Sequence, residues 1–227
     1  MKHLFSTTAL IAALGMAGMA SAGALEEPAP EPPVAAPVDW SGAYVGLIAS
    51  FNSGDFGGEF GGADIFPGDG SGDLSGNSFG LVLGYDVQNG QYVYGGEFSY
   101  ASADITGSED CNNPAFQCAF EVEKVASLRG RIGYLVAPKT LVYGTLGVTR
   151  AEATGFVDSG GGPIGEDNTI NGVVYGIGME KMIGERSRLR AAILRHDFDG
   201  EDFQTDILYE DIESAFTSVE FGFTFSF

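Results

Sequence analysis

Apolar and polar side chains alternate along most of the chain from Trp40 onward. The alternation is clearest in the last segment, where large apolar residues occupy every second position and small or polar residues stand between them. These apolar residues are Val219, Phe221, Phe223, Phe225 and Phe227. Because residues i and i+2 of a β-strand lie on the same face, the pattern predicts a last strand with one wholly apolar face.

The same period of two predicts eight strands. They cover residues 40–51, 76–87, 92–104, 121–134, 141–152, 171–183, 187–198 and 213–227. Three connections are short, and one of them contains Asn89-Gly90, which suits a type I′ hairpin turn. The other four are predicted to be long loops: 52–75, 105–120, 153–170 and 199–212. The sequence therefore predicts an antiparallel meander with tight turns at one end and long loops at the other.

The positions of the charged residues indicate whether the apolar faces contact a protein core or lipid. A soluble barrel such as a lipocalin would turn its apolar faces inward, yet here the opposite faces carry Glu97, Arg129 and other ionisable groups in mid-strand. This conflict disappears if the apolar faces meet lipid and the strands close around a polar lumen. We predict an all-β fold, an eight-stranded antiparallel up-and-down transmembrane β-barrel. On the fourth strand this directs Val122, Leu128 and Ile132 toward lipid.

The predicted inward faces bring together acidic and basic side chains. They are Asp86, Glu97, Arg129, Arg131, Glu180, Arg190 and Glu220. Side chains fill the interior of an eight-stranded barrel, and a buried charge without a partner costs several kcal/mol. We expect these residues to form a paired network that plugs the lumen. The alternative is a ring of charges that gives selectivity to a narrow channel.

Four basic residues interrupt the lipid-facing rows: Lys124, Arg150, Lys181 and Arg195. All four fall near predicted strand ends, where a long side chain can reach the membrane surface. Lys124, Arg150 and Arg195 fall at the end with the long loops. We expect these three to contact lipopolysaccharide phosphates, and ordinary solvation at the rim is the alternative.

The segment before the strands predicts export. Residues 1–22 have a basic start, an apolar core and the small residues Ala20-Ser21-Ala22, as in a secretory signal peptide. Residues 23–38 form a Pro-rich periplasmic linker, and residues 39–227 form the barrel. In an oxidising compartment Cys111 and Cys118 are expected to form a disulfide. A metal pair is the alternative, but no His lies near them.

The amino-acid composition limits the classes of binding partner. Lys and Arg number 11 against 31 Asp and Glu, a formal charge of −20, which argues against nucleic acid. Much of the acid lies in the first and fourth predicted long loops and their margins. These residues are Asp55, Glu59, Asp64, Asp69 and Asp73, then Asp197, Asp199, Glu201, Asp202, Asp206, Glu210 and Asp211. Either they form a solvated surface, or they bind divalent cations weakly. We predict no cofactor and no specific metal site.

Several segments resemble small bacterial outer-membrane β-barrel proteins, the porin-family and OmpA-like eight-stranded barrels. They are "DWSGAYVGL", "LVLGYDVQNGQYVYGGEFSY", "ASLRGRIGYLVAPKTLVYGTLGV" and "LRAAILRHDF", together with the last strand. The resemblance spans about residues 39–227. It implies outer-membrane residence and insertion by the barrel assembly machinery, which would recognise Val219, Phe221, Phe223, Phe225 and Phe227. No peptidoglycan-binding domain is seen after the barrel, so cell-wall anchoring is not expected.

An enzymatic role is the least favoured of three functional hypotheses. Lipid A-modifying barrels use a His with a Ser and a carboxylate, and His196 stands beside Asp197 here. Only folding could bring Ser159 or Ser214 close to His196. We expect a structural outer-membrane protein rather than an enzyme. A narrow porin-like channel or a small-ligand binder is the second hypothesis.

Overall fold

The computed structural model describes residues 38–227, which form nine β-strands. The strands are β1 (Gly42–Phe60), β2 (Ala63–Phe66), β3 (Gly72–Asn89), β4 (Tyr92–Asp110), β5 (Gln117–Ala137), β6 (Thr140–Asp158), β7 (Pro163–Met182), β8 (Ser187–Gln204) and β9 (Leu208–Ser226). Within these residues there is no helix long and apolar enough to cross a bilayer.

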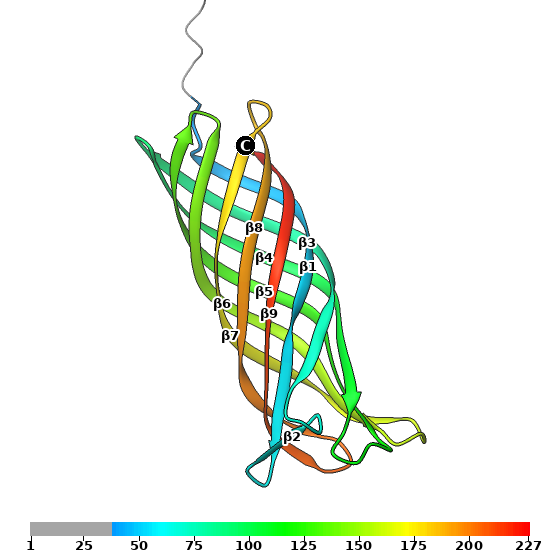
Figure 1. The fold of residues 1–227 in the computed structure, drawn as a ribbon. Coiled ribbons are helices and arrows are strands. Elements are labelled where there is room, and N and C mark those ends of the chain that lie inside the picture. The colour runs from blue at the N-terminus through cyan, green and yellow to red at the C-terminus, as the bar shows by residue number, and fades with distance from the viewer. Residues whose placement is uncertain (1–37) are drawn as a thin grey trace, which may run out of the picture. The chain divides into compact units, whose positions relative to one another are not determined.

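Eight of the strands close into a barrel (Figure 1). β1 and β3 to β9 pair antiparallel in chain order, and β9 returns to pair with β1 from Tyr44–Ser226 to Glu59–Glu210. The predicted eight-stranded up-and-down barrel is confirmed. The short strand β2 is additional and pairs only with the far end of β1. We call the end with the tight turns, where β9 finishes, the turn end, and the end with β2 the outer end.

The prediction of four long loops was wrong. Barrel strands run for 18 to 21 residues and absorb most of the segments expected to be loops. The outer-end connections are 61–71, which contains β2, then 111–116, 159–162 and 205–207. At about 3.3 Å per residue and a usual tilt near 40°, such strands rise about 45–53 Å, against an apolar band of about 25 Å. The barrel therefore continues well past the membrane.

The two parts of the barrel have opposite polarity. Near the turn end, apolar side chains point outward, and Leu146 and Ile177 are each 66% exposed. Toward the outer end, acidic side chains such as Asp55 and Asp104 point outward, while a hydrophobic core fills the interior. We call residues 52–78, 102–124, 150–171 and 195–217 the crown, and the remainder of the barrel the membrane band. The crown thus has the polarity of a soluble barrel. Its acidic outward residues are the reason why its strands were expected to be loops.

A bulge on β5 explains one wrong orientation. Val122 was expected to face lipid, but it is 1% exposed and belongs to the crown core. Between Val122 and Lys124 the β5–β6 register shifts, because Glu123 has no partner on β6. An extra residue moves the alternation by one position, so side chains beyond it change face. Leu128 and Ile132, on the other side of the bulge, face outward as predicted.

Candidate functional site: the lumen and the outer rim

The turn end of the lumen is closed by the residues that precede β1. Trp40 is fully buried in a cluster with Val93, Leu135, Leu141, Tyr143 and Met182. Its backbone N–H donates to Gln88 Oε1 at 2.8 Å, and its indole Nε1 donates to the Pro138 carbonyl at 3.4 Å. Just before it, Asp39 accepts the Ser41 N–H at 2.8 Å, which lowers the pKa of Asp39. These bonds hold the Trp40 side chain in place as the floor of the lumen.

A network of buried ions lies next to the floor, on the side toward the outer end. Glu97 is the centre of its first half. Arg129 and Arg190 both form ion pairs with Glu97, and the Arg190 Nη1–Glu97 Oε2 distance is 2.6 Å. The Tyr44 hydroxyl donates to Glu97 at 2.8 Å. Arg190 also reaches Glu220 Oε1 at 3.1 Å. One carboxylate thus holds side chains from β1, β5 and β8 together.

The second half of the network joins two carboxylates through two arginines. Arg131 Nη1 lies 2.6 Å from Glu180 Oε1, and Arg131 Nε lies 3.1 Å from Asp86 Oδ1. Arg188 Nη1 lies 2.7 Å from Asp86 Oδ2, and Arg188 Nη2 donates to the Trp40 carbonyl at 3.0 Å. The guanidinium carbon of Arg188 stands 4.8 Å from the centre of the Trp40 ring. The floor and the network are therefore one unit.

The structure brings all seven predicted lumen residues together and adds Arg188. The prediction omitted Arg188, although it precedes Arg190 by two positions and so shares its face. With Arg188 included, four arginines face four carboxylates, and the buried charge sums to zero. This balance needs no added ion.

The next layer of the lumen, toward the outer end, is polar and nearly filled. Hydroxyl and amide groups from several strands meet there: Ser127 Oγ lies 3.1 Å from Thr149 Oγ1, and Ser218 donates to Asn52 at 2.6 Å. The cavity among these groups has a volume of about 30 Å³. A cavity of that size holds one or two water molecules. The crown core then closes the lumen from the outer end.

His196 belongs to this polar layer. It is 5% exposed, its Nδ1 lies 3.3 Å from Thr149 Oγ1, and its ring stacks on Phe216 with centroids 4.9 Å apart. Within residues 38–227, His196 makes no hydrogen bond to Ser159, Ser214 or a carboxylate. The geometry of a serine–histidine–acid relay is therefore not assembled here.

The predicted rim residues lie on the outward faces of β5, β6 and β8, at the base of the crown. Lys124 pairs with Glu152, and Arg195 Nε lies 2.8 Å from Asp197 Oδ1. Arg150 is exposed and stands between Ala126 of β5 and Asn171 of β7. Of the three, Arg150 has no ion pair among the described residues.

Comparison with known proteins shows to which family the chain belongs. Residues 9–227 match the outer membrane protein beta-barrel domain. The chain belongs to this family. The 31 kDa outer-membrane immunogenic protein of Brucella melitensis is 30% identical over 216 residues, which are 87% of this chain and 89% of that protein. The 22 kDa outer membrane protein of Rhizobium leguminosarum bv. viciae is 29% identical over 185 residues, 78% of this chain and 74% of that protein.

A solved structure shares the fold. OprG from Pseudomonas aeruginosa matches with a TM-score of 0.52 and 14% sequence identity, covering 84% of this chain and 98% of that one. This protein is thus an outer-membrane β-barrel, as predicted. In such barrels the short turns lie in the periplasm and the opposite end faces outward. The turn end is accordingly periplasmic, and the crown projects from the cell surface.

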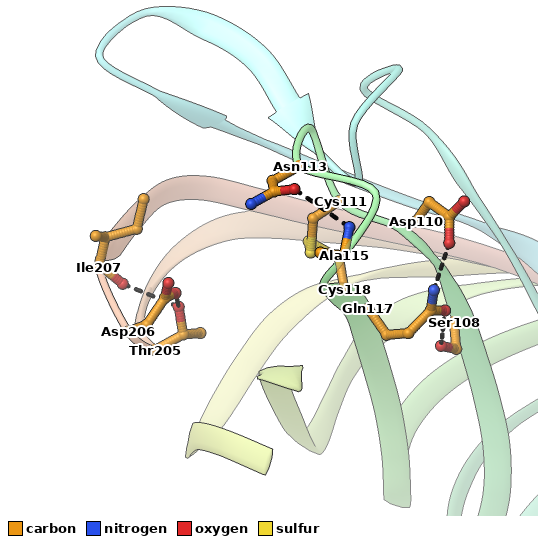
Figure 2. Close-up of a disulfide and its surroundings, with 10 residues drawn as sticks. All are labelled: Ser108, Asp110, Cys111, Asn113, Ala115, Gln117, Cys118, Thr205, Asp206 and Ile207. Carbon is orange, nitrogen blue, oxygen red and sulfur yellow. Dashed lines mark hydrogen bonds between the residues drawn. A yellow bond between two sulfur atoms is a disulfide. The ribbon is translucent and has the colours of Figure 1, made fainter. Parts of the chain in front are cut away.

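A disulfide closes the β4–β5 connection in the crown (Figure 2). Cys111 and Cys118 form it, and both side chains are buried in the crown core. Cys111 N–H donates to the Phe116 carbonyl at 2.9 Å, and Gln117 reaches Asp110 and Ser108 on the neighbouring strand. The metal-pair alternative for the two cysteines is ruled out by this bond. More generally, residues 38–227 contain no group of three acidic, His or Cys side chains placed to hold a metal ion.

The last strand of the outer-membrane barrel presents its aromatic row to lipid. Val219, Phe221, Phe223, Phe225 and Phe227 are all exposed on the outward face, and Phe227 is the most exposed at 73%. The backbone N–H of Phe227 donates to the Ala43 carbonyl at 3.0 Å, at the place where the barrel closes. The predicted signal peptide and nearly all of the predicted linker lie outside the described residues.

Proposed function

We propose that this protein is a structural, non-catalytic barrel of the outer membrane of a Gram-negative bacterium, whose closed lumen supports an exposed crown. The observation that carries the proposal is the stack of three fillings in the lumen: the Trp40 floor, the neutral ion network and the crown core. The cavity of about 30 Å³ is far below the several hundred Å³ of ordinary ligand pockets. A narrow channel would need a continuous path that these layers interrupt.

Single-channel recording in planar bilayers tests the closed lumen. The full mature protein should give no steady conductance at any applied potential. A uniform, reproducible conductance step from the pure protein would refute the proposal and favour the porin-like hypothesis. A lipid A-modifying activity that His196→Ala abolished would instead refute the non-catalytic part.

For the outer rim, we propose that basic side chains bind lipopolysaccharide phosphates. Arg150 is the strongest candidate, because Lys124 and Arg195 already have carboxylate partners. Arg150→Ala should lower the lipopolysaccharide that co-purifies with the protein. Lys181→Ala is the matched control, since Lys181 is also an exposed base but lies at the periplasmic end of β7. Equal retention in Arg150→Ala and wild type would remove the idea.

We also propose that the aromatic row of β9 is read by the barrel assembly machinery during insertion. Its support is the run of exposed apolar side chains from Val219 to Phe227. Phe227→Ala should lower the yield of inserted barrel in cells while leaving refolding from urea into detergent unchanged. A loss of refolding in detergent would show that Phe227 acts on stability instead.

A further inference from the structure

The barrel wall is incomplete at one place in the crown. The pairing of β7 with β8 begins at the turn end and stops at Gly172–Phe198. On its other side, β7 stays paired with β6 without a break as far as Pro163. Residues 163–171 of β7 therefore form a regular strand with one neighbour, and we call them the free edge. Figure 1 shows the tip of the β6–β7 hairpin (yellow-green) standing apart from the β8–β9 connection (orange).

Two hydrogen bonds at the turn end show which backbone groups point toward this edge. Met182 N–H donates to the Lys139 carbonyl, next to β6, and Ile183 N–H donates to the Ser187 carbonyl of β8. Even-numbered residues of β7 thus turn their backbone groups to β6, and odd-numbered residues turn theirs to β8. No register shift interrupts β7. Along the free edge the odd-numbered residues, Thr169 among them, therefore direct N–H and C=O groups to a side without a paired strand.

A bulge on β8 explains why the pairing stops. From Phe198 to Glu201, β8 advances by three residues, while its partner β9 advances by two, from Ser214 to Ile212. An extra residue of this kind disrupts the ladder and can end the pairing with a neighbouring strand. The missing pairs thus follow from the sheet geometry of β8, and β7 itself stays regular.

Two side chains of β7 take the place of backbone bonds beyond the bulge. Asn168 Nδ2 donates to the Asp202 carbonyl at 2.9 Å, and the Gln204 N–H donates to Glu166 Oε2 at 3.2 Å. Both bonds are exposed to solvent. Because water replaces an exposed hydrogen bond at little net cost, these side chains can give way to a backbone partner. The free edge is therefore covered by contacts that a competing strand can displace.

The charge around the free edge indicates the chemistry of a partner. The two facing segments, residues 163–171 and 199–204, contain five carboxylates and no Lys or Arg. The carboxylates are all exposed and belong to Glu166, Asp167, Asp199, Glu201 and Asp202. None of them forms an ion pair within residues 38–227. A second copy of this chain would bring the same acidic edge, and like charges on opposite strands disfavour such a pairing.

We propose that the free edge binds an extended, basic polypeptide segment of another protein by strand addition. The segment pairs antiparallel with residues 163–171, replaces the Asn168 and Glu166 contacts, and places its Lys or Arg side chains against the carboxylates of β7 and β8. Exposed strand edges accept such segments because main-chain hydrogen bonds supply the affinity. At 3.3 Å per residue the free edge spans about 30 Å, enough for a strand of ordinary length. The proposal needs the outward position of the crown and is independent of the closed lumen.

Fluorescence anisotropy with a labelled peptide of alternating Lys and Thr, about eight residues long, tests the site. The full mature barrel is used in a zwitterionic detergent at about 150 mM NaCl, where exposed charges are largely screened. Wild type should bind the peptide saturably. In the proposed pairing the Lys residues stand opposite Asp167 and Thr169, so their backbone N–H groups face β7. The same peptide, N-methylated on the backbone at every Lys, keeps its charge and should bind about tenfold more weakly or worse.

Two substitutions of Thr169 separate backbone pairing from charge. Thr169→Pro removes one edge-facing N–H, and proline is tolerated on an edge strand, so the affinity should fall by about tenfold while gel mobility shows a folded barrel. Thr169→Val keeps the N–H and should change the affinity by less than about twofold. Asp199→Asn with Glu201→Gln should weaken binding by about threefold, from the loss of two exposed ion pairs. If Thr169→Pro failed to fold, the methylated peptide would still decide.

Four results would overturn the proposal. The first is the absence of saturable binding to wild type. The second is equal binding of the plain and methylated peptides, which would show charge attraction without strand pairing. The third is an equal loss of affinity in folded Thr169→Pro and Thr169→Val. The fourth is equal binding of a peptide of alternating Glu and Thr, which would refute a basic partner.

Discussion

Replacement of Glu97 by Gln should be the most damaging neutral substitution in the lumen. Glu97 is 3% exposed and forms ion pairs with Arg129, with Arg190 at 2.6 Å and with Arg131 at 3.5 Å. Gln keeps the size of the side chain but leaves the network with one excess positive charge. Removing one partner from a buried ion pair costs about 3–5 kcal/mol. That is a large share of the 5–15 kcal/mol by which folded proteins are commonly stable.

Glu220→Gln is the matched comparison, because Glu220 is equally buried but has one ion pair, with Arg190 at 3.1 Å. We expect a cost of about 1–3 kcal/mol for this change. Glu97→Gln combined with Arg129→Gln restores neutrality, so its cost should be smaller than the sum of the single changes by about 1–3 kcal/mol.

Urea unfolding of the refolded barrel in phospholipid vesicles measures these differences. Trp40 is the only tryptophan in the chain and stacks on Arg188 beside the network, so its fluorescence reports the transition. The reasoning fails if Glu97→Gln costs no more than Glu220→Gln. It also fails if the double variant is simply additive, because the charge balance would then be irrelevant to stability.

Three further predictions concern the floor, the crown and the boundary between crown and membrane band. Trp40→Ala should lower the free energy of unfolding by about 3–5 kcal/mol, as measured by circular dichroism in urea, because it empties the floor; a loss below about 1 kcal/mol would contradict this role. Cys111→Ser with Cys118→Ser removes the disulfide that closes an eight-residue loop, and this closure stabilises the fold by about 2–3 kcal/mol. Limited proteolysis should therefore cut the crown of the double variant faster than that of wild type, and unchanged resistance would argue against this role of the disulfide. Leu146→Arg in the membrane band should cost about 2–4 kcal/mol, whereas Asp104→Arg in the crown should stay within about 0.5 kcal/mol. Equal costs at these two positions would show that the boundary is misplaced.

The amino-acid sequence by itself determined the architecture of the membrane band. Period-two alternation, with Leu128 and Ile132 on one face and Arg129 and Arg131 on the other, assigned lipid and lumen without any tertiary information. This worked because neighbouring side chains of a strand point to opposite faces. A single register therefore places the apolar residues against lipid and the charged residues in the lumen. The members of the ion network followed from the same alternation, with Arg188 as the omission.

The crown was less accessible from sequence because its alternation is reversed and its outward residues are acidic. Segments such as 153–158 and 199–204 were therefore expected to be loops, although they continue β6 and β8. The bulge at Glu123, which buries Val122, depends on pairing between strands and leaves no local signal. Local patterns show which residues share a face, but they do not show where the pairing register shifts.

Only the tertiary structure decided which distant residues meet. The acidic segments around Asp55 and Glu213 were visible in the sequence as two unrelated clusters, and the closure of β9 onto β1 made them the walls of one groove. Trp40 likewise became the floor only when the strands curled around it. The physical reason is that alternation acts within a strand, over a few ångströms, whereas closure depends on strand number, stagger and tilt, which belong to the whole barrel.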